Sequence, residues 1–592
     1  MTEIEEKARR ALKTVPAAPT AIVPASVRYL DLAENIVRRA LKWQNAQGRI
    51  IDPYAQKETN AATARFTGAL GLQILQNRCA DLLEPCMRSL DCVLDDLFYQ
   101  RTNWGEFIVK EACMAFWALR DKAAKKRVAR WEHYLSAYDP EQAYARTFTN
   151  VAPDQLQNFC TFAIAGEVIK QKLGLTSDPV FIERYFEQQL TCFDENGMYK
   201  DPNSPVIYDM VSRMNFSLAL WAGYHGKYFK DINEKLRLGA LAQLLYQSPA
   251  GECPYGGRSN QQNFGEATFA LICEFEASRW EKNNDQLLSG AFKRAAALAV
   301  NSLERYLSGD SIYSSKNFFP PELQHGRPGG YGFYGVYTLL IAGQLGFAAL
   351  LADCDIRPGP VCPAENGAYV FITGDGFHKI FAGCRGVQVE IDRNADFDYD
   401  ATGLGRMHFI GCPPELALSC PITATPKYLT SVPSAPVNIA SGPGWDNLWL
   451  AGLNKNQKLN SECDILKETP DCVKFKLSYR CDSGAVSETY RISADDVSIS
   501  VIQEEGKPVS FRVPLLETSG RERSEIEILH DGFKVSLSDF VYLARNTGSP
   551  AKIEIEEFSS PNANGIYRTG NFHSRDNRIE IKFSVTRKNS AD

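Results

Sequence analysis

The segment LADCDIRPGPVCPAENG, residues 351–367, divides the chain into two parts with different hydrophobic patterns. Before it, residues 27–352 carry the spacing of helices, as in FGEATFALICEFEASRW (264–280), where apolar residues recur at intervals of three and four. After it, apolar and polar residues alternate, as in VKFKLSYR (473–480) and IEIKFSVTR (579–587), which is typical of half-exposed antiparallel strands. A run of helices followed by a run of strands predicts separate layers or domains.

The patterns predict an N-terminal extension at 1–26, a helical domain at 27–352, a linker at 353–367 and an antiparallel β-sandwich at 368–592. The helical part has room for about ten to twelve helices of ordinary length. A ring of helical hairpins packs that many antiparallel helices economically and brings their inner ends together around a central pit. No repeat is strong enough to indicate a solenoid.

The composition is that of an ordinary globular chain of 592 residues, with 44% hydrophobic residues, 23% charged residues and a net charge of −6. Acidic and basic residues are mixed, which argues against a nucleic-acid partner. The N-terminus is acidic and lacks the apolar core of a secretory signal, so we expect a cytoplasmic protein. Residues 338–352 are too short and too broken by glycine for a membrane span, so we expect a buried helix there and no membrane partner. The sixteen cysteines lack zinc-site spacing and are expected to be reduced, mostly buried thiols.

Chemistry-bearing residues gather in glycine- and aromatic-rich clusters at expected helix ends. In NGMYKDPNSPVIYDMVSR (196–213), turn signals precede Tyr208 and Asp209, which stand before a helix that contains Arg213. A tyrosine beside an arginine is a candidate for proton transfer, because a nearby positive charge favours phenolate. Arg213 could instead grip a substrate carboxylate. The competing interpretation is structural, with Asp209 as an N-cap that pairs with Arg213 one helical turn later.

The cluster CPYGGRSNQQNFGEA (253–267) combines Tyr255, Arg258, Asn263 and Glu266 with further amides. Amides and arginine together suit the hydroxyls and carboxylates of sugars, so we expect Tyr255, Arg258 and Asn263 to bind substrate. Glu266 is a candidate acid or base, and its structural alternative is a helix N-terminal glutamate favoured by the helix dipole. The glycines do not form a phosphate-binding loop, because no GK[ST] follows them.

A third cluster, ELQHGRPGGYGFYGVY (322–337), contains His325, Arg327, Tyr331 and Tyr334. The ordinary pKa of histidine suits general acid or base work near neutral pH, which makes His325 a catalytic candidate. Arg327 and the two tyrosines are candidates for binding substrate, because aromatic rings stack on sugar rings.

Three further segments complete the set of candidates. Asn158 stands at an expected helix start, where its amide could polarise a carboxylate or simply cap the helix. Residues 49–66, with Arg65, could line the mouth of the same cleft. In the second region, residues 394–409 form a loop that could reach the cleft and bring His408 to substrate, or a turn between sheets.

The layout and the motifs resemble heparinase II/III-like and alginate-type polysaccharide lyases. Asn158 is followed some fifty residues later by NGMYKDPNSPVIYD (196–209), which carries Tyr208 where the family has its catalytic tyrosine. The resemblance implies an (α/α) toroid followed by an antiparallel β-sandwich, and His325 in place of the later catalytic histidine. Phe159 departs from the histidine that often follows the family's asparagine. Other clusters look similar to those of glucuronidase-type glycoside hydrolases.

The leading functional hypothesis is β-elimination at a uronic acid residue of an oligo- or polysaccharide. The reaction removes the proton next to the carboxylate and expels the 4-linked sugar. Asn158, with Arg213 or Arg258, would neutralise the carboxylate, since this acidifies the neighbouring proton. His325 or Tyr208 would act as the base, and Tyr208 as the acid for the leaving oxygen.

Two other functions stay open. A glycoside hydrolase would need a carboxylate pair on opposite sides of the bond, from Asp209, Glu266 and Glu322. A non-catalytic glycan-binding protein is disfavoured by the variety of titratable groups. The expected partner is a uronic-acid oligosaccharide, and no cofactor motif is present. A structural metal stays open, because His378, His408 and acids of the second region could gather in space, and so does a homo-oligomer.

Overall fold

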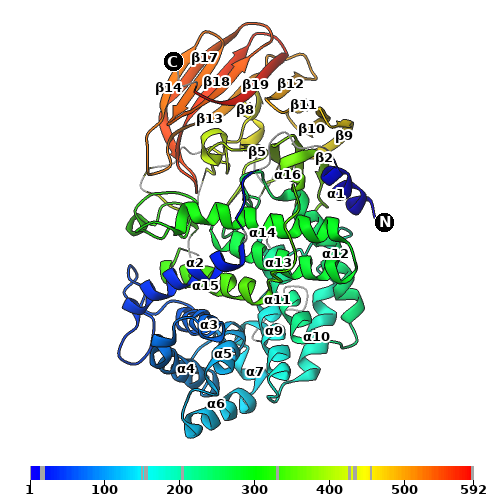
Figure 1. The fold of residues 1–592 in the computed structure, drawn as a ribbon. Helices are drawn as coiled ribbons and strands as arrows, with labels where there is room; N and C mark the ends of the chain where they lie inside the picture. The colour runs from blue at the N-terminus through cyan, green and yellow to red at the C-terminus, as the bar shows by residue number, and fades with distance from the viewer. Residues whose placement is uncertain are drawn as a thin grey trace.

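The computed structural model describes residues 2–13, 20–23, 25–148, 151, 158–201, 206–328, 332–395, 397–424, 428–430, 432, 437–453 and 457–588. Two stacked regions make up the molecule, with helices in one and antiparallel sheets in the other (Figure 1). The last long helix ends at Leu351, and β2, the first strand after it, begins at Gly367. The predicted fold class, helices followed by antiparallel sheets, is confirmed, and the residue limits of the four segments stay a proposal.

Helices of two kinds build the first region. Those of the inner ring contact one another in order, with the last returning to the first: α3 (Ala62–Leu75), α5 (Gly105–Leu119), α9 (Phe159–Lys172), α11 (Val206–Ala222), α13 (Phe264–Lys282) and α15 (Tyr334–Leu351). Those of the outer layer pack against them: α2 (Ala25–Ala40), α4 (Leu83–Phe98), α6 (Lys125–Ala137), α10 (Pro179–Leu190), α12 (Phe229–Tyr246) and α14 (Gln286–Leu307). This is the ring of hairpins that the helical spacing predicts, as far as the described residues show it.

The inner helices are buried on nearly all sides because neighbours surround them. In α5, for example, buried residues occupy almost every position from Gly105 to Leu119. The outer helices have one exposed face, and two of them begin at aspartate caps: Asp178 accepts from the N–H of Phe181 at 2.9 Å in α10, and Asp285 from that of Leu288 at 3.2 Å in α14. α15 has the length and composition of a membrane span, but 83% of it is buried among other helices. The buried helix predicted at 338–352 is therefore confirmed.

Short helices complete the connections. α1 (Glu3–Lys13) packs against α12 and the first strand of the sheets, and α16 (Pro363–Asn366) joins the two regions. α7 (Pro140–Ala143) and α8 (Ala145–Phe148) lie between α6 and α9, and α17 (Pro414–Ala417) lies among the strands. No disulfide joins any of the sixteen cysteines, all of which lie within the described residues, and most of them are buried.

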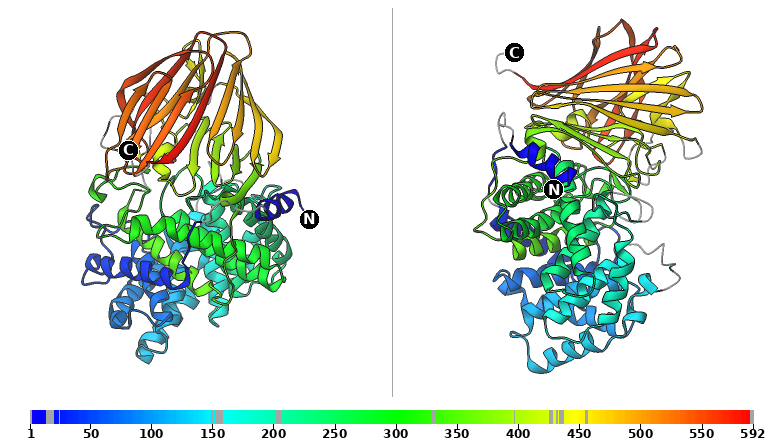
Figure 2. Two further views of the ribbon diagram at one scale, coloured as in Figure 1. Left: turned by 45° about the horizontal axis from the view of Figure 1, so that its top comes forward. Right: turned by 90° about the vertical axis from the view of Figure 1, so that its right-hand side faces the viewer.

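A four-stranded antiparallel sheet lies directly on the helices (Figure 2). Its strands run in chain order: β2 (Gly367–Ile372), β3 (Lys379–Cys384), β4 (Val387–Asp392) and β5 (Gly403–Phe409). Both faces are buried, which corrects the half-exposed strand expected at 387–392. The polar residues of β4 face the helices and bind them, as when the Gln388 amide donates to the carbonyls of Leu245 (3.2 Å) and Gln247 (2.8 Å).

Two larger antiparallel sheets form the predicted sandwich. The first has the order β14-β15-β16-β19-β12-β11-β10-β9 and the second β17-β18-β13-β7-β8. Aromatic rings pack between them, with Phe533 against Phe572 at 5.0 Å and Phe511 against Phe583 at 6.3 Å between centroids. The strands of the first sheet are β9 (Asn460–Thr469), β10 (Cys472–Cys481), β11 (Gly484–Ile492), β12 (Val497–Gln503), β14 (Glu525–Leu529), β15 (Gly532–Leu537), β16 (Phe540–Asn546) and β19 (Arg578–Arg587). Those of the second are β7 (Gly442–Trp445), β8 (Leu448–Trp449), β13 (Ser510–Thr518), β17 (Ala551–Pro561) and β18 (Ile566–Ser574).

Candidate functional site

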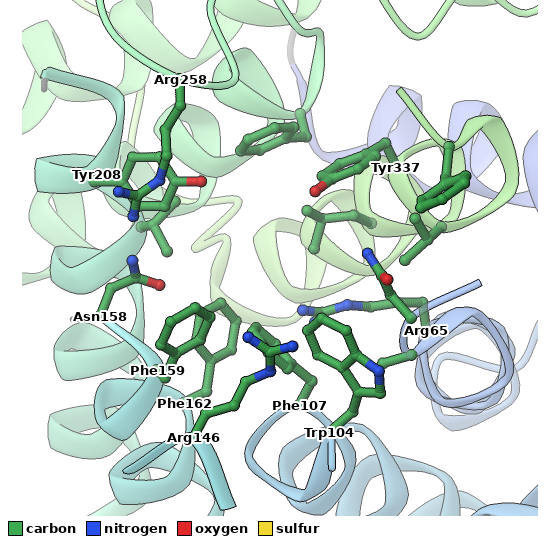
Figure 3. A pocket seen from close by; sticks show the side chains of 17 residues that line it. Arg65, Trp104, Phe107, Arg146, Asn158, Phe159, Phe162, Tyr208, Arg258 and Tyr337 are labelled. Carbon is green, nitrogen blue, oxygen red and sulfur yellow. The ribbon is translucent and has the colours of Figure 1, made fainter. Parts of the chain in front are cut away.

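A cavity of about 340 Å³ lies where the inner helices begin (Figure 3). Every helix of the inner ring contributes to it from its first turns or from the residues just before them. The lining residues are Asn60, Ala61, Arg65, Trp104, Phe107, Arg146, Asn158, Phe159, Phe162, Tyr208, Val211, Arg258, Phe264, Phe333, Val336, Tyr337 and Leu340. The central pit expected from the ring of hairpins is this cavity.

The cavity favours an anion. Helix N-termini carry partial positive charge, and here several point to one place. Three arginines, Arg65, Arg146 and Arg258, also line it, and two of them have buried carboxylate partners: Glu111 for Arg65 and Asp201 for Arg258. None of the described lining residues is a carboxylate.

Asn158 and Arg258 meet on one buried carboxylate, that of Asp201. The Asn158 backbone N–H donates to Asp201 Oδ1 at 2.8 Å, and its side-chain Nδ2 lies 3.3 and 3.2 Å from the two carboxylate oxygens. The Arg258 guanidinium donates to Asp201 Oδ2. Burial raises the pKa of Asp201, while Arg258 and the Asn158 N–H groups oppose that rise. Asp201 therefore fixes an amide and a guanidinium side by side at the cavity wall.

Tyr208 lies beside this pair on the first turn of α11. The Arg258 guanidinium carbon lies 4.0 Å from the centroid of the Tyr208 ring, and the Tyr208 hydroxyl lies 3.1 Å from Ser259 Oγ. This contact is a cation–π interaction, which holds the guanidinium against the ring. The sequence clusters at 158, 196–213 and 253–267 thus converge on one wall of the cavity.

The loop that carries Arg258 has an unusual backbone. Gly256 and Gly257 have φ of 133° and 74°, and the non-glycine residues Ser259 and Gln261 have φ of 63° and 57°. Left-handed conformations at non-glycine positions cost about 1–2 kcal/mol each, so surrounding contacts must hold the loop.

The sheet region supplies part of that support. Asp400 accepts from the N–H of Gly257 at 3.0 Å and from Asn260 Nδ2 at 3.5 Å. The Lys379 ammonium lies 3.4 Å from the centroid of the Tyr255 ring. The loop at 394–409, expected to reach the cleft, contacts the Arg258 loop through Asp400.

The opposite wall is aromatic and cationic. The Arg146 guanidinium lies 3.6 Å from the centroid of the Trp104 ring, and Phe107 and Phe162 flank the Arg65 guanidinium at 5.2 and 5.3 Å. Arg65 also forms a buried ion pair with Glu111 at 2.5 Å. Flat aromatic faces next to cations suit the apolar faces and anionic substituents of sugars.

Asp209 and Arg213 lie away from the cavity. They form a fully buried ion pair at 2.9 Å. Arg213 also donates to the Leu236 carbonyl at 2.8 Å, and Asp209 accepts from the Tyr199 N–H at 2.8 Å. The pair one helical turn apart matches the structural interpretation, although Asp209 lies inside α11 and is not its N-cap, and we do not retain the two residues in the proposed site.

The loop that carries Arg258 is held from outside the cavity by three of the candidate residues, Glu266, Asn263 and Tyr255. Glu266 pairs with the Lys316 ammonium at 2.6 Å and accepts from the Cys253 N–H at 2.8 Å. Asn263 Nδ2 donates to the Tyr313 carbonyl at 2.7 Å. Tyr255 is buried between the helices and the sheets. None of the three lines the cavity.

The third cluster is divided: Phe333, Val336 and Tyr337 at its end line the cavity, whereas its candidate residues His325, Arg327 and Tyr334 do not. His325 is buried against Phe319, with ring centroids 4.0 Å apart, and burial lowers its pKa to about 4. Arg327 packs over the ring of Tyr334 at 5.0 Å, and the Tyr334 hydroxyl donates to the Ile312 carbonyl at 2.7 Å. Tyr331 lies outside the described residues.

His408 in β5 is buried, and its Nε2 lies 2.8 Å from Ser419 Oγ. Burial lowers its pKa well below the ordinary value. Among the described residues, no group of three or more His, Cys, Asp or Glu side chains is arranged to hold a metal ion.

Sequence reasoning missed Trp104, Phe107, Arg146 and Tyr337. Trp104 stands between Asn103 and Gly105, and Tyr337 closes the third cluster, but neither was singled out there; Arg146 has no glycine or amide beside it. Their position relative to the beginnings of the inner helices is the signal that could have found them.

The chain superposes along nearly its whole length on known polysaccharide lyases. Heparinase III matches with a TM-score of 0.52 at 8% identity, over 98% of this chain and 88% of that chain. The chain has the fold of heparinase III. A second heparinase III gene product matches with a TM-score of 0.50 at 9% identity, over 99% of this chain and 89% of that chain.

A mutant heparan sulfate lyase from Pedobacter heparinus matches with a TM-score of 0.46 at 11% identity, over 99% of this chain and 88% of that chain. No protein-family model and no curated protein sequence matches. At these identities the comparison shows the fold, and it confirms the resemblance to the heparinase-type layout.

Proposed function

We propose that the protein is a carbohydrate-active enzyme that cleaves glycosidic bonds at uronic acid residues by β-elimination. The observation that carries this proposal is the convergence of Asn158, Tyr208 and Arg258 on one wall of an anion-favouring cavity. The fold shared with heparinase III supports the same class of reaction.

The wall supplies the groups that elimination requires. A uronate carboxylate placed between Asn158 Nδ2 and the Arg258 guanidinium would be neutralised by N–H donors, which stabilises the enolate formed when the neighbouring proton leaves. Asp201 holds both donors and so reduces the reorganisation needed on binding. Tyr208, under the Arg258 cation, takes the proton as its phenolate.

The aromatic wall would bind the rest of the substrate. Trp104 and Phe107 line the cavity on the side away from Tyr208, and Phe162 lies beside Phe159 below Asn158 (Figure 3). Arg146, stacked on Trp104, provides a cation for a second anionic substituent. We propose a uronic-acid oligosaccharide as the substrate.

The glycoside hydrolase alternative has less support. Hydrolysis needs two carboxylates about 5 to 10 Å apart across the bond. Asp209 and Glu266 are engaged in buried ion pairs, and Glu322 lines a different cavity beside Tyr54 and Tyr334. Elimination uses the residues that do line the described cavity.

The test is an assay of uronic-acid oligosaccharides that records ultraviolet absorbance and new reducing ends together. Elimination produces an unsaturated uronate, so both signals should rise in step. Tyr208→Phe should lower kcat by about 10²- to 10⁴-fold, while the matched control Tyr54→Phe, in the separate cavity, should keep it. Reducing ends that accumulate without absorbance would refute elimination.

The cytoplasmic location is likewise a proposal. It would place the enzyme on imported oligosaccharides rather than on polymers. Fractionation of the source cells checks it, and activity recovered from the medium would contradict it.

A further inference from the structure

A second tyrosine, Tyr337, lines the cavity that contains Tyr208. It stands on the first turn of α15, and its ring stacks on Phe264 with centroids 5.7 Å apart and planes at 28°. Its hydroxyl points into the cavity from the side opposite Asn158 and Tyr208 (Figure 3). The ring is therefore fixed while its acidic group faces the space that substrate would fill.

The surroundings of Tyr337 favour its protonated form. Burial raises the pKa of Tyr337 well above the ordinary value, and the charge of Tyr208 raises it further, while Arg65 and Arg258 oppose the rise. A phenol that stays protonated is available to donate its proton. The Arg258 guanidinium lies 4.0 Å from the centroid of the Tyr208 ring, on the other side of the cavity.

The reaction needs a base and an acid, and the cavity lining offers two tyrosines for these roles. His325, the expected base or acid, is buried outside the cavity with Nε2 3.1 Å from the Asn562 carbonyl. No histidine occurs among the described lining residues. Titratable groups that pack near Tyr337 are Tyr208, Arg65 and Arg258.

We propose that Tyr337 is the general acid that protonates the leaving glycosidic oxygen, while Tyr208 is the base. This division of roles rests on the proposed elimination. The Tyr208 phenolate forms an O–H bond as the uronate C5–H bond breaks, and that electron pair becomes the C4–C5 double bond. The C4–O bond breaks with its electrons on oxygen, which takes the proton of Tyr337. Proton return from Tyr208 to Tyr337 through water restores both groups, so the cycle needs no other reactant.

A change of leaving group separates an acid from a structural residue. A glycosidic oxygen needs a proton to leave, whereas fluoride at C4 leaves as an anion. Tyr337→Phe should lower kcat on the glycoside by about 10²- to 10⁴-fold and stay within a few-fold of wild type on the 4-fluoro uronide. Tyr208→Phe should lose activity on both substrates, because proton abstraction is common to them.

The outcomes are distinct. Full activity of Tyr337→Phe on the glycoside, or equal loss on both substrates, would overturn the role of Tyr337. A wild-type enzyme that forms no unsaturated product from either substrate would instead overturn the proposed elimination.

A second measurement does not depend on the phenylalanine variant. Incorporation of 3,5-difluorotyrosine at position 337 makes the phenol more acidic. If Tyr337 is the acid, the alkaline limb of the kcat profile on the glycoside moves to lower pH, and the profile on the fluoride does not. An unmoved alkaline limb on the glycoside would contradict the proposal.

Discussion

The buried pair of Asp201 and Arg258 gives a prediction that links stability to activity. In Arg258→Met, the Asp201 carboxylate keeps its hydrogen bonds from Asn158 but loses its counter-ion. Removing one partner of a buried ion pair lowers the free energy of unfolding by about 3–5 kcal/mol. Because Asn158 still donates hydrogen bonds to the Asp201 carboxylate, we expect a loss near the lower end of this range, about 3 kcal/mol. With an unfolding entropy of about 2 cal/mol/K per residue and a cooperative unit of roughly 300 residues, the melting temperature should fall by roughly 5 °C.

The loss of stability in Arg258→Met should depend on pH in a defined direction. Burial raises the pKa of folded Asp201, so its contribution to stability is present below the ordinary pKa of an aspartate and is lost as pH rises through the folded value. Without Arg258 the folded pKa of Asp201 rises further, because the positive charge that lowers it is gone. The difference in melting temperature between wild type and Arg258→Met should therefore be small at acid pH and grow toward neutral pH.

Calorimetry on a matched set of variants tests this reasoning. The double variant Asp201→Asn with Arg258→Met removes both charges and should recover most of the lost stability, but it should not recover activity, which needs the guanidinium. If Arg258→Met melts like wild type at neutral pH, or the double variant melts no higher than the single one, the pair is not coupled as described.

Three further predictions concern other parts of the chain. An added Cβ at Gly239 would collide with the Arg213 guanidinium, so Gly239→Ala should lower the melting temperature by several degrees. At Gly442 an added Cβ meets nothing within 4 Å, so the control variant Gly442→Ala should keep the melting temperature. Equal melting temperatures for the two variants would contradict the close packing of Gly239 against Arg213. Asp400→Asn weakens a hydrogen bond to the loop that carries Arg258, so kcat/KM should fall about 10-fold in initial-rate assays. An unchanged kcat/KM would argue that the sheets do not hold this loop in place. Burial raises the pKa of Glu488 to about 8, so its stabilising contribution is complete below its ordinary pKa and is lost as pH rises through about 8. Glu488→Gln should therefore melt higher than wild type near pH 8 but not near pH 4 in calorimetry, and the opposite order would refute the shift.

Much of the fold was accessible from the sequence because periodicity reports burial. The change of period after residues 351–367 marks the passage from helices to strands. The four-stranded sheet was less clear, because its polar residues are buried against the helices. The Gln388 amide, for example, binds backbone carbonyls of the helical region. The pattern of residues within the strand does not predict this contact.

The site was partly accessible for a similar reason. Asn158, Tyr208 and Arg258 stood out as polar groups at helix starts, and the ring brings those starts together. Arg213 and Glu266 carried the same local signal, yet their contacts hold the scaffold. Sequence alone shows that a helix begins near a residue but not whether its side chain faces the cavity or the packing behind it.

The measurement that most directly tests elimination at this cavity is digestion of a uronic-acid oligosaccharide in water enriched in heavy oxygen, with mass analysis of the products. Elimination breaks the bond without water, so wild-type enzyme should yield an unsaturated uronate and no product that carries heavy oxygen from the cleavage step. Tyr208→Phe should yield neither fragment at a comparable rate. A saturated uronate with heavy oxygen at the cleaved bond would contradict the account and establish hydrolysis instead.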